Sequence, residues 1–286
     1  MKIGFIGQGW IGKHYADEFE LRKHDVVRYA LEAPYISNKD LIASCHIVFI
    51  AVPTPTTLAG FDYNIVVESL TLVGSGNIAV IKSTLLPGTT EKLQEQFPEI
   101  FVVHSPEFLV EKTAAFDAAH PKRNLIGIPK DTPEYREKAT AVLAILPYAP
   151  YTKIMQARDA ELVKYAGNCF LYTKVIFMNM LYDLASAQGV DWETLREALV
   201  HDPRIGDSHT NPIHSSGRGA GGHCFIKDFE AFRLQYAEAV GDQAGNATLQ
   251  ALVDKNAALL ITSNKDLDLL MGVYGNTYQT KEAYIK

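Results

Sequence analysis

The sequence predicts an α/β protein in which a doubly wound, Rossmann-type parallel sheet is followed by an all-α domain built on one long helix. Short β-branched runs alternate with amphipathic stretches through the first half, which is typical of βαβ units and a parallel sheet. A Gly-x-Gly-x-x-Gly motif directly follows the first of these runs. Residues 157–188 contain no proline and a single glycine, which favours one continuous helix.

The individual elements follow from the spacing of apolar residues and from the residues that end each run. We expect six strands, over residues 3–6, 26–29, 46–52, 77–82, 100–103 and 125–128. We expect helices over 10–21, 157–188, 192–200, 228–240 and 247–261, with Gly189 ending the long helix and Asp191 capping the next. Residues 201–226 are rich in Gly, Pro, Ser, His and Asn, which predicts a long loop. The expected domains are 1–154 (dinucleotide-binding), 155–265 (helical) and 266–286 (a tail).

The composition is that of a globular protein and disfavours several classes of function. Of 286 residues, 47% are hydrophobic and 21% are charged, and the net charge is −6. This charge, with no Lys/Arg-rich run, argues against nucleic-acid binding. Three widely spaced cysteines fit neither a disulfide framework nor a metal site, and the histidines of residues 201–223 lack ligand spacing, so we expect no metal. We expect a cytoplasmic, non-membrane protein because neither a signal peptide nor an apolar run of about 20 residues is present.

Residues 7–12 have the spacing of a dinucleotide-binding turn. Gly7 permits a tight turn, Gly9 lets the backbone approach a pyrophosphate, and Gly12 allows close packing of helix on strand. Trp10 and Ile11 lie at the helix N-terminus, where N–H groups face the phosphates. The acidic residue expected about 20 positions later is missing, because Ala30 stands there. NAD is the favoured cofactor, but NADP is not excluded, since Arg28 could meet a 2′-phosphate or be an exposed cation.

Six ordered segments resemble the nucleotide-sugar dehydrogenase family, which includes UDP-glucose 6-dehydrogenase and GDP-mannose dehydrogenase. The resemblance covers roughly residues 1 to 260. It implies that Val52, Pro53, Thr54 and Thr84 contact the cofactor. The matching segments are residues 7–12, 51–56 (AVPTPT), 82–89 (KSTLLPGT), 105–109 (SPEFL), 160–168 (AELVKYAGN) and 221–228 (GGHCFIKD).

The family oxidises a primary alcohol to a carboxylate by two successive hydride transfers at one carbon. The resemblance makes Cys224 the nucleophile, whose thiolate adds to the intermediate aldehyde. A helix start just after Cys224 would favour the thiolate; the structural alternative is a small buried residue in a turn. Lys164 and Asn168, four residues apart on one helix face, match the donors that stabilise the oxyanion, although Lys164 could instead be a surface lysine. Asp228 matches an acid that positions or activates water, and could equally be a helix cap.

The resemblance also implies further contacts with water, protons and substrate. Thr84 and Glu111 match residues associated with the catalytic water and proton transfer. Loop 204–222 resembles the sugar-binding loop of the family, with exposed loop residues as the alternative reading. Residues 157–188 match the helix that mediates dimerisation, so we expect a homodimer. The remaining candidates for substrate binding are Glu107, Phe108, Leu109, Asn211, Arg218 and Gly221.

The chain also departs from the family pattern. His223 and Ile226 replace a typical Ser and Pro around Cys224, and only 58 residues follow Asp228. Members usually carry a third, Rossmann-like domain that grips the nucleotide, so we expect most or all of it to be missing. The favoured function is NAD-dependent oxidation of a UDP-glucose-like nucleotide sugar. The alternatives are a single-step β-hydroxyacid-type dehydrogenase, which needs no cysteine, and a catalytically idle NAD-binding dimeric subunit.

Overall fold

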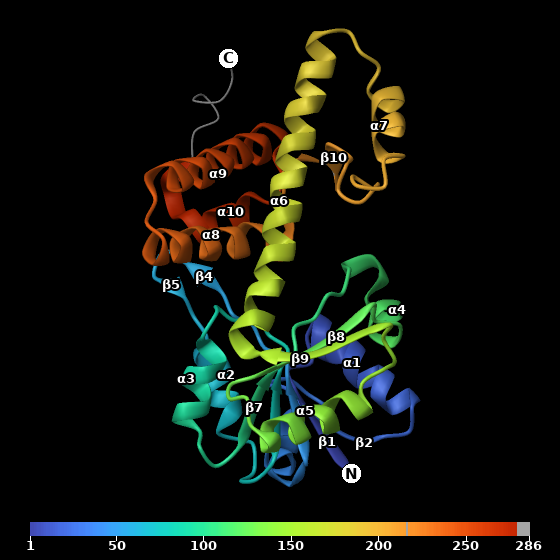
Figure 1. The fold of residues 1–286 in the computed structure, drawn as a ribbon, viewed down its shortest axis with the longest axis vertical. Helices are drawn as coiled ribbons and strands as arrows, with labels where there is room; N and C mark the ends of the chain where they lie inside the picture. Colours follow the sequence, from blue (N-terminus) through green and yellow to red (C-terminus); the bar gives the residue numbers. More distant parts are fainter. Residues whose placement is uncertain (216, 279–286) are drawn as a thin grey trace. The chain divides into compact units, whose positions relative to one another are not determined.

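The computed structural model describes residues 1–215 and 217–278, and the chain divides into two compact units (Figure 1). The first unit comprises residues 1–55 and 62–164. The second comprises residues 56–61 and the chain from residue 165 onward. The division therefore falls inside the long helix and not before it, where the sequence suggested a boundary after residue 154. Among the described residues, none of the helices combines the length and apolar character that crossing a bilayer requires.

The first unit is built on a seven-stranded sheet in the order β2-β1-β3-β6-β7-β8-β9. All neighbours are parallel except β7 and β8, which run antiparallel. The chain reverses its direction of winding between β1 and β3, and such a switch point is where open α/β sheets bind ligands. The strands are β1 (Lys2–Ile6), β2 (Asp25–Tyr29), β3 (Ile47–Ile50), β6 (Ile78–Ile81), β7 (Phe101–His104), β8 (Arg123–Ile128) and β9 (Tyr151–Gln156).

Apolar side chains on both faces of this sheet form the core of the first unit. Strands β3 and β6 are buried at every position, as parallel strands covered on both faces must be. Phe5 stacks on Phe49, and Phe19 of the first helix packs edge-on against both rings. The helices that cover the sheet are α1 (Trp10–Leu21), α2 (Asn64–Leu70), α3 (Thr89–Gln96), α4 (Ala114–Ala119) and α5 (Pro133–Ile145), with the 3-10 segments η1 (Ile36–Ser44) and η2 (Glu111–Thr113).

The second unit is helical and has its own core. Helix α6 (Ala157–Ala187) is continuous over 31 residues and enters this unit at Tyr165. Tyr172 of α6 stacks on Phe229 at 3.9 Å between ring centroids, and both are buried. The other elements are α7 (Trp192–Val200), β10 (Ile213–His214), β11 (Gly217–Arg218), α8 (Gly222–Ala239), α9 (Gln243–Ser263), α10 (Leu267–Tyr274) and η3 (Gly275–Tyr278), joined by the hairpin of β4 (Thr56–Thr57) and β5 (Gly60–Phe61).

The fold class predicted from the sequence is confirmed, and the differences lie in individual elements. No range was predicted for helices α2 to α5 and α10, for strand β9, or for the hairpins of β4 with β5 and of β10 with β11, the last of which lies in the predicted loop 201–226. Residues 267–278 form α10 and η3 where a tail was predicted, because Leu270 and Val273 are buried in the helical core. The rest of that predicted tail, residues 279–286, lies outside the described residues. Helix α8 begins at Gly222, six residues earlier than predicted, so Cys224 is inside its first turn.

A buried carboxylate joins the start of α6 to the start of α3. Glu161 has no exposed surface, and its carboxylate accepts hydrogen bonds from the backbone N–H of Gly88 at 2.6 Å and of Thr90 at 2.8 Å. The Thr90 hydroxyl donates a third, at 2.5 Å. Burial raises the pKa of Glu161, and these three donors oppose that shift. Glu161 therefore supplies the cap that α3 lacks within its own sequence.

We predict that Glu161→Ala will lower the free energy of unfolding by about 3 kcal/mol, because three donors, two of them buried, lose their acceptor. Urea unfolding followed by circular dichroism measures this. The control is Asp191→Ala, which removes the exposed cap of α7 and should cost about 1 kcal/mol. Equal losses in the two variants would contradict the role assigned to Glu161.

Candidate active site

The glycine turn after β1 has the geometry of a phosphate-binding turn. Gly7 has φ +88°, and a Cβ there would lie 2.2 Å from the carbonyl oxygen of Ala51. A Cβ on Gly12 would lie 1.9 Å from the carbonyl oxygen of Gly7, so helix α1 approaches the turn too closely for any side chain. A Cβ on Gly9, in contrast, would meet no atom within 4 Å, and Gly9 is the N-cap of α1 without a side-chain hydrogen bond. The backbone N–H groups at the start of α1 are thus accessible to an anion, which fits the pyrophosphate of a dinucleotide.

The loops after β3 and β6 meet beside this turn. The Val52 N–H donates to the Ser83 hydroxyl at 2.9 Å, and that hydroxyl donates back to the Val52 carbonyl at 2.7 Å. The Thr54 hydroxyl donates to the Thr84 carbonyl at 2.9 Å. The predicted cofactor residues of these two loops are therefore brought together at the carboxyl edge of the sheet, with Trp10 and Ile11 at the start of α1.

Arg28, the candidate for a 2′-phosphate, is occupied by other partners. Its side chain is buried and forms ion pairs with Asp17 and Glu20, each at 2.7 Å. Two carboxylates already neutralise this guanidinium, so it is poorly placed to select a doubly charged phosphate. This geometry removes one reason for leaving NADP open, and the missing acidic residue at Ala30 was the other.

Lys164 and Glu107 form a buried ion pair in the first unit. The Lys164 ammonium donates to the Glu107 carboxylate at 2.6 Å and to its backbone carbonyl at 2.8 Å. Both side chains are less than a tenth exposed. Lys164 is therefore not the solvated surface lysine of the alternative interpretation. Glu107, a secondary candidate in the sequence, is the partner that balances its charge, whereas Glu111 is exposed at the start of η2.

A second buried lysine, Lys82, lies at the end of β6 and was missed by the sequence reasoning. Its ammonium donates to the Ser105 hydroxyl at 3.0 Å and lies 4.4 Å from the centre of the Tyr15 ring. Burial lowers the pKa of Lys82 to about 7, and the negative charge of Glu107 opposes that shift. Its position immediately before Ser83 and Thr84, in a matched segment, was the available signal.

The second unit contains the predicted nucleophile. Cys224 is exposed and is the third residue of α8, where the helix dipole and the N–H groups of the first turn favour a thiolate. Asp228 lies one turn later and is 1% exposed. Its two carboxylate oxygens accept from the Asn168 amide and the Lys227 ammonium, each at 2.6 Å. Asp228 thus holds Asn168 of α6 against α8, and does not act as a helix cap.

The glycine-rich approach to Cys224 packs against the end of α9. The Ala220 N–H donates to the Asn256 side chain at 2.7 Å, and the Asn256 amide donates to the Ala220 carbonyl at 3.0 Å. The Arg218 N–H donates to the Ser263 hydroxyl at 2.9 Å. A Cβ on Gly217 would lie 2.6 Å from the Lys265 side chain. These glycines therefore allow close approach of α9, a reason that the sequence alone did not suggest.

The remaining candidates for substrate binding differ in their burial, in their partners and in the unit to which they belong. Arg218 is held by the Asn179 side chain at 2.8 Å and by Asp183 at 2.6 Å, both on α6. Asn211 is exposed in the loop that follows α7. The Phe108 ring stacks with the Arg123 guanidinium at 3.6 Å. Phe108 and Leu109 are half-buried in the first unit, whereas Asn211, Arg218 and Gly221 belong to the second.

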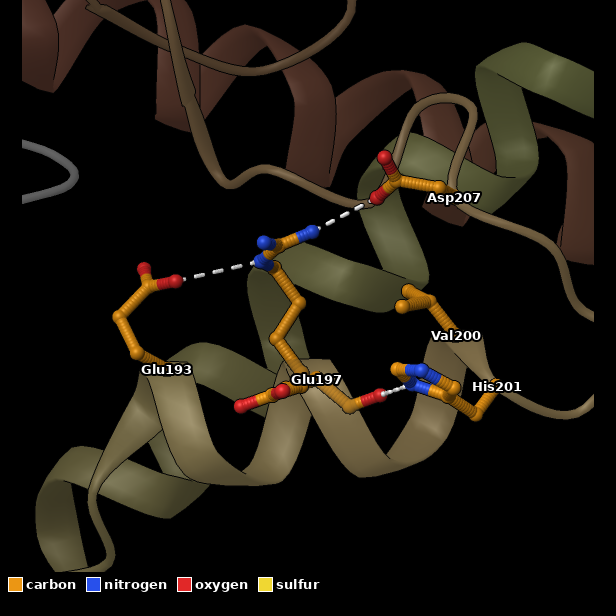
Figure 2. A pocket seen from close by; sticks show the side chains of 6 residues that line it. Glu193, Glu197, Val200, His201 and Asp207 are labelled. Carbon is orange, nitrogen blue, oxygen red and sulfur yellow. Dashed lines mark hydrogen bonds and ion pairs between the residues drawn. The ribbon is translucent and has the colours of Figure 1, made fainter.

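A separate surface pocket of about 410 Å³ lies along α7 and the loop after it (Figure 2). Arg196 lines it and is paired with Glu193 at 3.3 Å and Asp207 at 2.7 Å. None of the predicted site residues lines this pocket. Within residues 1–215 and 217–278, no group of three or more His, Cys, Asp or Glu side chains is arranged to hold a metal ion.

The sequence matches two domains of one enzyme family. Residues 31–145 match the NAD-binding domain of the UDP-glucose/GDP-mannose dehydrogenase family, and residues 158–257 match its central domain. The chain belongs to the UDP-glucose/GDP-mannose dehydrogenase family. The resemblance found in the ordered motifs is therefore confirmed. NAD, the cofactor predicted from the sequence, is confirmed by the matched NAD-binding domain.

Individual relatives of this family agree with the assignment. The UDP-glucose 6-dehydrogenase of Pseudomonas aeruginosa is 33% identical over 83% of this chain and 52% of its own length. The chain spans about half the length of the first curated relatives that it matches. The UDP-glucose dehydrogenase structure from Pyrobaculum islandicum has 28% identity and a TM-score of 0.75, covering 92% of this chain and 71% of that one.

A more distant structure shares the layout of both units. The 3-hydroxyisobutyrate dehydrogenase of Mycobacterium tuberculosis has a TM-score of 0.69 and 17% identity, covering 96% of this chain and 99% of that one. This likeness concerns the fold alone. A dinucleotide-binding domain with a long helix is thus common to both classes of dehydrogenase, and the fold does not distinguish this family from single-step enzymes.

We predict that the stability difference between Lys82→Met and the native chain will depend on pH. The folded chain loses the Lys82 proton near pH 7, whereas the unfolded chain keeps it until about pH 10.5. Between these values the unfolded state binds more protons, so the native free energy of unfolding rises with pH. Any stability advantage of Lys82→Met should shrink by about 2 kcal/mol between pH 7 and pH 9.

Urea unfolding of both chains at several pH values measures this difference. The control is Lys130→Met, which changes a lysine exposed in the folded chain and should give a constant difference over the same range. A constant difference for Lys82→Met would contradict the burial of its ammonium.

Proposed function

We propose that this chain oxidises the primary alcohol of a nucleotide sugar, such as UDP-glucose, to a carboxylate, with NAD as acceptor and Cys224 as nucleophile. The geometry of α8 carries the proposal: Cys224 is exposed in its first turn, and Asp228 is buried one turn later against Asn168. The other cysteines, Cys45 and Cys169, are buried. Burial raises the pKa of both thiols, which makes them poor nucleophiles.

The proposed chemistry consists of two oxidations followed by a hydrolysis. NAD, when bound, accepts one hydride in each oxidation. The alcohol first loses a hydride and a proton to give the aldehyde. The Cys224 thiolate then adds to the aldehyde carbon, and the adduct takes up a proton to give a thiohemiacetal. The thiohemiacetal loses the second hydride and a proton to become a thioester. Water cleaves the thioester, which releases the carboxylate and restores the thiol. We assign Thr84 and Glu111 to the positioning of water and to proton transfer, as the family resemblance implies.

Lys164 and Asn168 are the proposed donors to the oxyanion that forms at the reacting carbon. The Lys164 ammonium is held by Glu107, which fixes its direction and balances its charge. The Asn168 amide group has two N–H bonds and donates one of them to Asp228. Asp228 accordingly orients the amide of Asn168. This role explains why a buried carboxylate lies one turn after the nucleophile.

We predict that Cys224→Ala will abolish formation of the carboxylate. NADH absorbance with purified chain, NAD and UDP-glucose measures turnover, and mass spectrometry identifies the product. The native chain should form two NADH per substrate. Cys224→Ala should lower the rate of carboxylate formation by about 10³-fold or more, because the aldehyde is no longer held covalently. Cys45→Ala, a buried cysteine outside the proposed site, is the matched control and should retain native turnover.

The same measurement separates the alternatives. Full turnover by Cys224→Ala, with one NADH per substrate, would favour a single-step β-hydroxyacid-type dehydrogenase. NAD binding by the native chain without turnover on UDP- or GDP-sugars would favour the idle subunit. The cytoplasmic location expected from the sequence remains a prediction that these measurements do not address.

We also propose that the chain forms a homodimer through α6. Phe170, Phe177 and Leu184 are spaced seven residues apart and are 69%, 56% and 58% exposed. Large apolar side chains at this spacing form a continuous stripe along one face of a helix. Met180, which is 43% exposed, widens the stripe. A second copy of α6 is the partner that the family resemblance implies.

We predict that Phe177→Glu will shift the chain from dimer to monomer, because a carboxylate would be buried in an apolar interface without a partner. Size-exclusion chromatography with light scattering measures the mass. The control is Phe116→Glu on α4, where the native ring is 58% exposed and so equally accessible. A native chain that is already monomeric, or an unchanged mass for Phe177→Glu, would contradict the proposed interface.

A further inference from the structure

The segment between α9 and α10 reaches back to the N-terminus of α8. The Asp266 carboxylate accepts a hydrogen bond from the backbone N–H of Gly222 at 2.8 Å. Gly222 is the first residue of α8 and lies two positions before Cys224. Asp266 itself has φ +50°, a left-handed conformation that is uncommon for aspartate. The contact joins residues 44 positions apart, so it depends on the tertiary fold of this unit.

The same segment contacts residues 219–221, just before α8, at two further points. The Lys265 ammonium is buried and donates to the Gly219 carbonyl at 2.9 Å. A Cβ on Gly221 would lie 1.9 Å from the Asp266 carboxylate oxygen. The carboxylate therefore fills the place of a side chain at residue 221. Gly221 was expected to contact substrate, but Asp266 alone already requires glycine at this position.

A carboxylate at this point affects the thiol in two ways. It fixes the direction of the first turn of α8, and hence of Cys224. It also brings a negative charge to a helix end whose dipole would otherwise favour a second anion, the thiolate. Other charged or titratable groups of this region include Lys227 and Asp228 on α8, His223 next to Cys224 in sequence, Lys265, and Asp268, which is exposed on α10. The loop after α7 contributes His209, whose ring lies 5.5 Å from the ring of Phe225. Helices α6 and α9 contribute the uncharged Asn168 and Asn256.

We propose that Asp266 is a positioning residue for Cys224, which holds the first turn of α8 in place and restrains ionisation of the thiol by its negative charge. This inference rests on the proposed function only for the catalytic role given to Cys224. The restraint keeps an exposed cysteine from reacting with other electrophiles. Asp266 does not touch substrate in this scheme and acts through α8.

The test measures the alkylation rate of Cys224 by iodoacetamide as a function of pH, with the modified peptide quantified by mass spectrometry. Asp266→Asn keeps a side-chain oxygen that can accept from Gly222 but removes the charge. We expect the midpoint of its profile to lie about half a pH unit below that of the native chain. Asp242→Asn is the matched control, since Asp242 caps α9 through the N–H groups of Ala244 and Gly245. Its profile should coincide with the native one.

Gly221→Ala provides a second variant, because its methyl group must displace the carboxylate. It should move the midpoint in the same direction and lower kcat more than it changes KM, as expected for a misplaced nucleophile. An unchanged midpoint in Asp266→Asn, or an equal shift in Asp242→Asn, would overturn the inference. So would unfolding of Asp266→Asn under conditions where Asp242→Asn stays folded. Alkylation requires no turnover, so its result stands even if the proposed function fails.

Discussion

The buried ion pair between Lys164 and Glu107 is the constraint that fixes the start of α6 within the first unit. Two charges are removed from water there, and the cost is large unless each charge has close partners. The partners are present, because Lys164 bonds both to the carboxylate and to the backbone carbonyl of Glu107. This geometry holds the start of α6 against the loop after β7. The helical period then places Asn168 on the same face as Lys164, one turn along.

Two other buried carboxylates are satisfied by the backbone or by another side chain. Glu161 accepts from the N-terminus of α3, and Asp228 accepts from Asn168 and Lys227. The buried ammonium of Lys82 has weaker partners, one hydroxyl and one aromatic ring. Incompletely satisfied charges of this kind are a cost to stability and commonly occur at functional sites.

The sequence was sufficient to predict the fold class, the long helix and the glycine turn, because each depends on local periodicity or on backbone conformation. It did not reveal β9, whose residues Tyr151 to Lys153 are exposed and lack a continuous apolar run. It did not reveal Asp266 either, since the partner of that residue is 44 positions away. Lys164 and Asp228 were found by resemblance, but their burial and pairing depend on contacts that spacing cannot show. Arg28 was misjudged as available because its acidic partners lie on another element, α1.

The hydrogen bonds that hold residues 218–222, the segment before Cys224, have a consequence for the order in which the chain is synthesised. The side chains that bond to the backbone of residues 218–222 in the contacts described above come from residues 256–266, so these contacts span 36 to 46 positions of sequence. These groups follow Cys224 in the chain, so the contacts form only after residues 256–266 have been synthesised. The segment beyond α9 thus completes the hydrogen bonding of the turn before Cys224, and a chain that ended before residue 266 would lack the carboxylate that accepts from Gly222.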